Sequence, residues 1–277
     1  MTLPSIPLAG VIGNPIAHSK SPLLHGHWLK TYGITGHYVP LEVDAEHLEA
    51  VLKAMPQMGF VGCNVTIPHK ERVVQFVDQI TDRATLIGAV NTLIFRPDGS
   101  IVGDNTDGYG FIENLRHGAP EWQAEAGPAV VLGAGGAARA VVASLLDAGV
   151  PEILLTNRTR VRADRLREDF GARVKVVEWV QAGNILEEAA TLVNTTSLGM
   201  AGKSELRIPM DGLRSETVVT DLVYNPLITN FLKTAQERGC VTVDGLGMLL
   251  HQAVPGFERW FGRRPVVDEA TRQVVLG

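Results

Sequence analysis

The sequence predicts an α/β protein built from two domains. Short β-rich runs alternate with helical stretches through the first hundred residues, and the same alternation starts again near residue 128. Such alternation is typical of βα units that build a largely parallel sheet. A chain of 277 residues is long enough for two domains, and its 45% hydrophobic and 20% charged residues are ordinary globular values. We therefore expect two α/β domains with mainly parallel sheets.

The first domain is expected to begin with a strand and a helix. Pro22 suits a first helical turn, so a helix should open at Ser21 and run to about Tyr32, where Gly33 stops it. Asp44 is a good N-cap residue for a second helix through residue 54. Five apolar or β-branched runs predict strands at residues 8–12, 38–43, 59–66, 89–95 and 100–103.

The second domain should follow a short helix at residues 109–116, which Gly118-Ala119-Pro120 ends. Runs such as Val130-Val131-Leu132 are apolar without alternation, as in strands that helices cover on both faces. We place the first domain at 1–107 and the second at 108–246, and we expect a helical tail, 247–277, to pack back on the first. Strands are expected at 129–132, 152–156, 174–177, 191–194, 218–222 and 241–243, and helices at 136–148, 160–170 and 228–238.

Charge and composition exclude several classes of function. The formal net charge of -5 and the lack of long Lys/Arg runs argue against a nucleic-acid partner. Two cysteines, Cys63 and Cys240, cannot form a disulfide framework or a four-thiolate zinc site. His25 and His27 point to different faces of a helix, so no metal site is expected. Without an apolar run of about 20 residues or a basic leader, we expect a cytoplasmic monomer or homodimer with no membrane partner.

A glycine-rich loop indicates a dinucleotide site. Gly133-Ala134-Gly135-Gly136-Ala137 follows a buried strand pattern and opens an Ala-rich helix. Gly133 permits a tight turn, and Gly135 lets the backbone approach a pyrophosphate. The unpaired N–H groups of the helix N-terminus attract the anion. The second domain is therefore expected to be Rossmann-like.

The end of the next strand predicts which dinucleotide binds. NAD-specific proteins carry a carboxylate there for the ribose 2′-hydroxyl, whereas this chain has Asn157-Arg158-Thr159, with Arg162 one helical turn on. A guanidinium pairs bidentately with phosphate oxygens. Two such charge-assisted bonds would favour NADP(H) by about 10² to 10⁴. We predict that Arg158 and Arg162 bind the 2′-phosphate, although a solvated basic helix start would have the same composition.

Polar residues at the strand ends of the first domain predict a substrate site. Ser19 and Ser21 lie in a turn-forming loop beside a helix start and suit a carboxylate, although caps and turns alone explain such serines. Thr66, Lys70, Asn91 and Asp107 likewise fall at or just after strand ends of the same sheet. A lysine desolvated beside a carboxylate is poised to give or take a proton, whereas an exposed pair of this kind contributes little.

Taken together, these motifs resemble the shikimate dehydrogenase family, and the matches run in order through nearly the whole chain. The residues that carry the resemblance are Gly13-Asn14-Pro15, His18-Ser19-Lys20-Ser21-Pro22, Asn64-Val65-Thr66-Ile67-Pro68-His69-Lys70, Ala89-Val90-Asn91-Thr92, Gly103-Asp104-Asn105-Thr106-Asp107-Gly108, Gly133-Ala134-Gly135-Gly136-Ala137, Asn157-Arg158-Thr159, Asn194-Thr195-Thr196-Ser197-Leu198-Gly199-Met200, Asp221-Leu222-Val223-Tyr224-Asn225-Pro226 and Asp244-Gly245-Leu246-Gly247-Met248-Leu249 through Gln252.

The resemblance implies NADPH-dependent, reversible reduction of 3-dehydroshikimate to shikimate, a step of aromatic amino acid biosynthesis through chorismate. The site would lie in a cleft between a three-layer α/β substrate domain with a mainly parallel sheet and a Rossmann-like NADP domain. Lys70 and Asp107 would be the catalytic couple. By matching positions, the substrate-binding residues would be Ser19, Ser21 and Tyr224 at the carboxylate and Thr66, Lys70, Asn91, Asp107 and Gln252 at the ring hydroxyls. The cofactor-binding residues would be Gly133 to Ala137, Asn157, Arg158, Thr159, Arg162, Thr195, Ser197, Met200, Gly245 and Met248.

Two alternatives remain at this stage. A quinate or shikimate/quinate dehydrogenase shares most of these motifs, and the side chain at Ser21 and the room around Tyr224 bear on that choice. Two carboxylate-side serines and Arg158 favour shikimate with NADP(H). The second alternative is a non-catalytic NADP-sensing regulator, against which the retention of both Lys70 and Asp107 argues.

Overall fold

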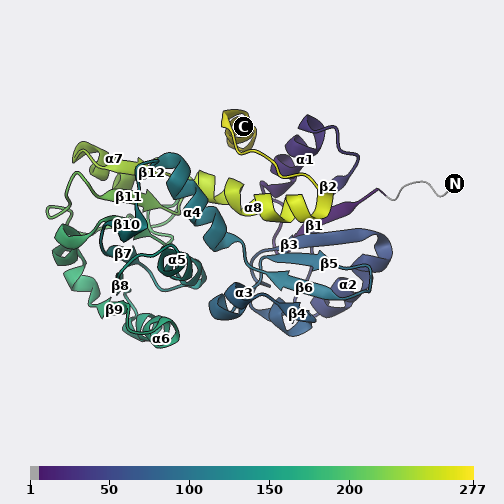
Figure 1. The fold of residues 1–277 in the computed structure, drawn as a ribbon, viewed down its shortest axis with the longest axis horizontal. Coiled ribbons are helices and arrows are strands. Elements are labelled where there is room, and N and C mark those ends of the chain that lie inside the picture. The colour runs from purple at the N-terminus through teal and green to yellow at the C-terminus, as the bar shows by residue number, and fades with distance from the viewer. Residues whose placement is uncertain (1–5) are drawn as a thin grey trace. The chain divides into compact units, whose positions relative to one another are not determined.

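A computed structural model describes residues 6–277 and divides the chain into two compact units. The first unit comprises Met1–Thr106 and Gln252–Gly277, and the second comprises Asp107–His251. The chain enters the second unit at the start of helix α4 (Asp107–Gly118) and leaves it within helix α8 (Leu246–Phe261), drawn in yellow in Figure 1. No helix among residues 6–277 is long and apolar enough to cross a membrane.

The first unit contains a six-stranded mixed sheet in the order β2-β1-β3-β5-β6-β4. Strand β5 runs antiparallel to both of its neighbours, and the other pairings are parallel. Residues that precede β5 therefore lie at the same edge as residues that follow β3 and β6. The strands are β1 (Leu8–Gly13), β2 (His37–Glu42), β3 (Phe60–Val65), β4 (Gln79–Ile80), β5 (Thr92–Phe95) and β6 (Ile101–Asp104).

Helices cover both faces of this sheet. One face packs its apolar side chains, such as Ile12 and Leu93, against Leu48 and Leu52 of α2, Val73 of η2 and Ala84 of α3. The other face receives α1 and the end of α8 through aromatic side chains. The helices of this unit are α1 (Ser21–Thr31), α2 (Leu48–Ala54), α3 (Asp82–Ile87) and α9 (Glu269–Leu276), with the short 3₁₀ helices η1 (Met55–Met58) and η2 (Arg72–Phe76).

One expectation for the first unit was wrong. Asp44 does not cap α2, which begins at Leu48 with His47 as its N-cap residue. The Asp44 carboxylate instead accepts a hydrogen bond from Asn14 Nδ2 at 2.8 Å, and its carbonyl accepts one from the His47 amide. Strand β4 and helix α3 were not predicted, because these elements are too short to show a hydrophobic period.

The second unit contains a wholly parallel sheet in the order β12-β11-β10-β7-β8-β9. The strand order reverses between β7 and β10, and ligands of open α/β sheets bind at such a switch point. The strands are β7 (Ala129–Leu132), β8 (Ile153–Thr156), β9 (Val174–Val177), β10 (Thr191–Asn194), β11 (Val218–Asp221) and β12 (Val241–Val243).

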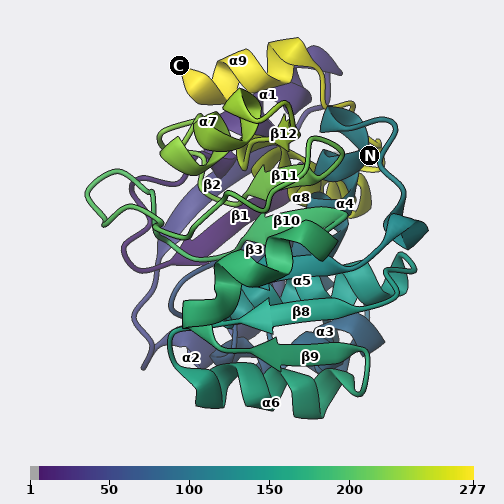
Figure 2. The same ribbon diagram turned by 90° about the vertical axis from the view of Figure 1, so that its left-hand side faces the viewer.

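Alternate residues of these strands face two helical layers, as the apolar runs predicted. Val131 and Val193 pack against α4, α5 (Gly136–Asp147) and α6 (Arg160–Phe170), whereas Val130, Leu132 and Leu192 face α7 (Asn230–Glu237) and the 3₁₀ helix η4 (Trp179–Glu188). A further 3₁₀ turn, η3 (Ala124–Ala126), precedes β7. Figure 2 shows α6 lying along β9. The predicted α/β fold class with parallel-rich sheets is confirmed.

A buried aromatic cluster fixes α1 and the end of α8 on the first sheet. His25 is fully buried, stacks on Tyr38 with ring centroids 3.9 Å apart, and contacts Trp28 and Phe257. Among the described residues neither ring nitrogen of His25 has a hydrogen-bond partner, and burial lowers its pKa from 6.5 to about 3. His25 is therefore a neutral core residue.

The same cluster explains a required glycine. The Trp260 side chain lies across Gly62, and its Nε1 donates to the Leu93 carbonyl at 3.0 Å. A Cβ at Gly62 would lie 2.1 Å from Trp260 Nε1. Only glycine lets this indole reach the sheet backbone.

Replacing His25 should reduce the acid sensitivity of the fold. In the unfolded chain His25 takes a proton near pH 6.5, whereas in the folded protein it stays neutral down to about pH 3. The burial of neutral His25 therefore stabilises the fold fully above pH 6.5, and the free energy of unfolding decreases as the pH falls below that value. Between pH 7 and pH 5 the free energy of unfolding should fall by about 2 kcal/mol more in the parent protein than in a His25→Phe variant.

Urea unfolding at the two pH values measures this difference. His27→Gln is the matched control, because His27 lies on the same helix but is only partly buried, and it should behave like the parent. Equal losses of stability in the parent and in His25→Phe would contradict the assignment of a neutral core histidine.

Candidate active site

Polar residues of the first unit collect at one edge of its sheet. Ser19 and Ser21 follow β1, and Thr66 and Lys70 follow β3. Asn91 immediately precedes β5, and because β5 is reversed, this residue lies at the same edge. The predicted convergence of these residues on one edge is therefore what the topology produces. Asn91 differs from the prediction in one respect: it was expected inside a strand at 89–95, and it reaches the edge because it precedes the reversed strand β5.

Asn91 is the best connected of these residues. Its side chain is 2% exposed, and its Oδ1 accepts hydrogen bonds from the Thr106 amide at 2.9 Å, from Thr106 Oγ1 at 3.2 Å and from Thr92 Oγ1 at 2.9 Å. Its Nδ2 donates to Gln252 Oε1 at 3.4 Å. Two predicted substrate-binding residues, 161 positions apart in the chain, are thus in contact.

Tyr38 and Asn64 extend this network. The Tyr38 hydroxyl donates to Asn64 Oδ1 at 2.7 Å. Asn64 Nδ2 in turn donates to the Asn91 carbonyl at 3.1 Å. Ser21 is buried at the start of α1, and its amide donates to Ser19 Oγ at 3.3 Å.

Lys70 stands at the end of a firmly anchored segment. Its carbonyl accepts a hydrogen bond from the Val90 amide at 2.8 Å, which fixes it beside the segment that leads to Asn91. The preceding His69 is fully buried, with Nε2 2.7 Å from the Val43 carbonyl, so it serves as an anchor. The Lys70 side chain itself is only partly buried.

Asp107 is the first residue of α4 and of the second unit, and its side chain is also partly buried. It comes directly after Thr106, whose amide and hydroxyl both donate to Asn91. Lys70 and Asp107 belong to different units, and their pairing stays a prediction.

The glycine-rich loop lies at the switch point of the second sheet. Gly133 has φ +109°, and a Cβ there would lie 2.6 Å from Thr195 Oγ1, so this position requires glycine. At Gly135 and Gly136 an added Cβ would meet nothing within 4 Å. Helix α5 begins here with Gly135 as its N-cap residue, so no capping side chain satisfies its first N–H groups. This geometry fits a dinucleotide pyrophosphate.

Two arginines beside this loop suit a phosphate. Arg158 and Arg162 are exposed, and neither forms an ion pair with any residue between 6 and 277. Arg160, by contrast, is engaged by Glu178 and by Asp164. The turn that presents Arg158 is shaped by Asn157, whose Nδ2 donates to the Thr159 carbonyl at 2.8 Å.

Asp221 joins the two loops that follow β10 and β11. It is fully buried, and its Oδ1 accepts from Asn194 Nδ2 at 2.8 Å and from the Val223 amide at 3.0 Å, while its Oδ2 accepts from Thr229 Oγ1 at 2.7 Å. Asn194 Oδ1 accepts from the Thr196 amide and hydroxyl at 3.0 and 2.7 Å. Burial raises the pKa of Asp221 from 3.8 to about 6.

These loops carry several of the expected cofactor and substrate contacts. Met200 and Tyr224 are 39% and 41% exposed, and Ser197 is exposed as well. Gly245 lies against the end of β11, where an added Cβ would be 2.4 Å from the Leu222 carbonyl oxygen. Met248, on α8, packs against the core of the second unit.

The residues that hold these loops in place had no predicted role. Asp221 and Asn194 each end an otherwise apolar strand run, a signal that could have marked them. Asn64 lay inside a quoted motif without a role, and nothing in the sequence distinguishes Tyr38 from an ordinary strand tyrosine.

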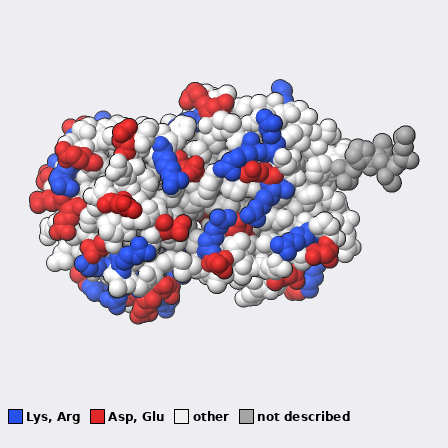
Figure 3. Space-filling view, in the orientation of Figure 1, with Lys and Arg blue, Asp and Glu red and all other residues white. Residues whose placement is uncertain are grey.

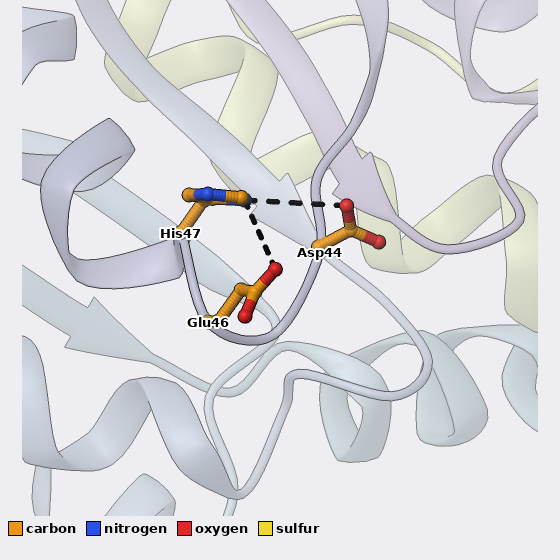
Figure 4. A group of neighbouring side chains, drawn as sticks. All are labelled: Asp44, Glu46 and His47. Carbon is orange, nitrogen blue, oxygen red and sulfur yellow. Dashed lines mark ion pairs between the residues drawn. The ribbon is translucent and has the colours of Figure 1, made fainter.

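One exposed cluster resembles a metal site. Asp44, Glu46 and His47 place their possible ligand atoms within 4.8 Å of one another in the turn after β2 (Figure 4). All three side chains are exposed, and Asp44 is already bonded to Asn14. We treat this cluster as surface charge.

Three features define a dinucleotide-dependent oxidoreductase of the Rossmann type. They are the strand order, the glycine-rich loop before the uncapped helix α5, and the two exposed arginines at the end of the next strand. Comparison with known proteins refines that class. Family models match residues 11–93 (shikimate dehydrogenase substrate binding domain), 121–246 (shikimate/quinate 5-dehydrogenase) and 245–276 (shikimate 5′-dehydrogenase C-terminal domain). The chain belongs to the shikimate dehydrogenase family.

Individual relatives agree with this assignment. The chain is 68% identical, over the full length of both proteins, to a shikimate dehydrogenase (NADP(+)) of Roseobacter denitrificans. It resembles the Thermus thermophilus shikimate 5-dehydrogenase in complex with NADP(H) and shikimate at a TM-score of 0.86 and 37% identity, covering 98% of each chain. It also resembles the Corynebacterium glutamicum quinate dehydrogenase in complex with NAD at a TM-score of 0.90 and 30% identity, covering 98% of this chain and 99% of that one.

The raised pKa of Asp221 predicts a specific dependence of stability on pH. The unfolded carboxyl group loses its proton near pH 3.8, but the folded one keeps it to about pH 6. Its contribution to stability is therefore present below about pH 4 and is lost as the pH rises through about 6. Relative to Asp221→Asn, the parent should lose about 2 kcal/mol of unfolding free energy between pH 4 and pH 7.

Urea unfolding of both proteins across this pH range gives the difference directly. Asp211→Asn is the control, because the Asp211 side chain is 91% exposed and should show no such difference. A constant difference between the parent and Asp221→Asn would show that burial does not raise this pKa.

Proposed function

We propose that this chain catalyses the reversible, NADPH-dependent reduction of 3-dehydroshikimate to shikimate. The observation that carries the proposal is the 68% identity, over the whole of both chains, to a protein named shikimate dehydrogenase (NADP(+)). The polar edge of the first sheet and the glycine loop of the second supply the residue types that this reaction needs.

The first unit supplies groups for a small polyhydroxylated acid. Ser19 and Ser21 bind the carboxylate, because hydroxyl groups beside a helix start donate readily to an anion. Thr66, Asn91 and Gln252 bind the ring hydroxyls. The contact between Asn91 and Gln252 supports this assignment, since both amides lie at one place on the sheet edge before any substrate binds. Tyr224 is a further residue that we propose for the carboxylate.

Lys70 donates and accepts the proton of the reaction. NADPH, when bound, supplies the hydride that reaches the ketone carbon. The Lys70 ammonium stabilises the negative charge that grows on the ketone oxygen and then delivers a proton to it. In the reverse direction the neutral amine accepts that proton from the alcohol. Asp107 orients Lys70 and accepts a hydrogen bond from a neighbouring hydroxyl.

The second unit binds NADP(H). Gly133 to Ala137 hold the pyrophosphate at the N-terminus of α5, and Arg158 and Arg162 bind the 2′-phosphate. The support is that both arginines are exposed without an ion-pair partner in residues 6–277 and that Gly135 and Gly136 border open space. The other cofactor contacts that we propose are Asn157, Thr159, Thr195, Ser197, Met200, Gly245 and Met248.

Shikimate is preferred over quinate in this proposal. The quinate dehydrogenase shares the fold at 30% identity, whereas the relative named for shikimate and NADP(+) is 68% identical. We further propose a cytoplasmic monomer or homodimer that binds neither nucleic acid nor membrane. The interspersed positive and negative side chains on the face drawn in Figure 3, with the net charge of -5, support the absence of a nucleic-acid site.

The activity and the role of Lys70 can be tested together. The parent protein mixed with shikimate and NADP⁺ should produce reduced cofactor, seen by its absorbance. Lys70→Ala should lower kcat by about 10² to 10⁴ with a modest change in KM, because it removes a group that acts in the transition state. Lys53→Ala is the control, since Lys53 is an exposed helix residue paired with Glu49 at 2.6 Å.

A parent protein that oxidises quinate but not shikimate would overturn the proposed substrate. Full turnover in Lys70→Ala would leave the substrate assignment standing and would remove Lys70 from the proton transfer.

Cofactor choice can be tested at the two arginines. Arg158→Ala should lower the ratio of kcat/KM for NADP⁺ to that for NAD⁺ by about tenfold to a hundredfold, because one charge-assisted contact to the 2′-phosphate is lost. Arg162→Ala should have a smaller effect in the same direction. Arg165→Ala removes the same charge from the exposed part of the same helix and should leave the ratio unchanged. An unchanged ratio in Arg158→Ala would refute its assigned role.

A further inference from the structure

A buried amide on α4 contacts the turn that leads into α8. Asn114 is 6% exposed, and its Nδ2 donates to the Asp244 carbonyl at 2.7 Å. An added Cβ at Gly247 would lie 1.8 Å from Asn114 Oδ1, and the three atoms nearest to it all belong to Asn114. One carboxamide thus contacts both ends of the segment from Asp244 to Gly247, which we call the 244–247 turn.

The segment after β11 also packs against this turn. An added Cβ at Gly245 would lie 2.4 Å from the Leu222 carbonyl oxygen, so the backbone of the turn lies close to the end of the strand. Within the turn, the Leu246 amide donates to Asp244 Oδ1 at 3.0 Å. The 244–247 turn is therefore in contact with both α4 and the end of β11.

Helix α4 also carries the proposed catalytic carboxylate. Asp107 and Asn114 are seven residues apart, about two helical turns, so they lie on one face of α4. One turn beyond Asn114, the ring of His117 lies 5.7 Å from that of His251 on α8. Asp107 and the residue that contacts the 244–247 turn are thus on one helix of the second unit.

The strand order indicates which part of the cofactor this turn would receive. A dinucleotide lies across the switch point of an open sheet, with one nucleotide half on each side. The glycine-rich loop and Arg158, which we propose for the pyrophosphate and the 2′-phosphate, follow β7 and β8. The 244–247 turn follows β12, on the other side of the switch point. The nicotinamide half therefore falls to this turn.

We propose that Asn114 is a positioning residue that holds the 244–247 turn for the nicotinamide half of NADP(H). This inference rests on the proposed function, which assigns Gly245 and Met248 to the cofactor. Asn114 does not touch the cofactor in this proposal and acts only through the turn. A carboxamide suits this role because its nitrogen donates to one carbonyl of the turn while its oxygen packs against a glycine.

The proposal predicts a loss of affinity that is confined to one half of the cofactor. Asn114→Asp keeps the shape of the side chain but replaces the donor nitrogen with an oxygen that faces the Asp244 carbonyl. Kd for NADP⁺, measured by calorimetry, should rise about tenfold because the turn is released. Kd for adenosine 2′,5′-bisphosphate, which lacks the nicotinamide half, should stay at the parent value.

Thr217→Val is the matched control. It removes another buried hydrogen bond of the second unit, from Thr217 Oγ1 to the Ala189 carbonyl at 2.7 Å, before the start of β11 rather than at its carboxyl end. Both dissociation constants should stay at parent values in this variant. An unchanged Kd for NADP⁺ in Asn114→Asp would overturn the proposal. An equal rise for both ligands would overturn it as well, because it would indicate a general loss of structure.

A second pair of variants tests the contact itself and covers the case in which Asn114→Asp does not fold. Gly247→Ala should raise Kd for NADP⁺ because its methyl group displaces the Asn114 side chain. Adding Asn114→Ala removes the obstructing atoms, so the double variant should bind NADP⁺ more tightly than Gly247→Ala alone. Additive losses of affinity would overturn the proposal. Failure of the proposed function is seen separately, as an absence of shikimate oxidation in a parent protein that binds NADP⁺.

Discussion

The satisfaction of two buried amides is the constraint on which the first unit depends. Asn64 and Asn91 are nearly inaccessible to solvent, and a buried amide without hydrogen-bond partners is costly. Each is therefore bonded to groups from several strand ends, and Asn91 also reaches Gln252 on α8. Satisfying these amides brings the ends of β3, β5 and β6 together with α8. The polar edge of the sheet is thus preorganised as a consequence of folding.

In the second unit a buried carboxylate connects the strand ends. Asp221 accepts hydrogen bonds from Asn194, Val223 and Thr229, and so it fixes the loops after β10 and β11 to each other. Gly133 brings the glycine-rich loop against the loop after β10, because only a glycine can lie so close to Thr195. In both units, buried polar residues at strand ends position exposed loops, and those loops carry the residues proposed to touch ligand.

The sequence was sufficient for the features that depend on local pattern. The parallel sheet of the second unit followed from apolar runs between helices, and the strand-end positions of Ser21 and Lys70 followed from turns after such runs. Features that depend on tertiary pairing could not be read this way. Strand β5 is reversed because it forms a hairpin with β6. Asp44 bonds Asn14 rather than capping α2, and a partner 30 residues away in the chain cannot be recognised from local pattern.

The supporting residues were missed for a related physical reason. A residue that binds ligand must be polar and near a strand end, and that combination is visible in sequence. A residue that only supports such a group, as Tyr38 supports Asn64, has to reach one buried oxygen and pack well, so its sequence pattern is the same as that of a core residue.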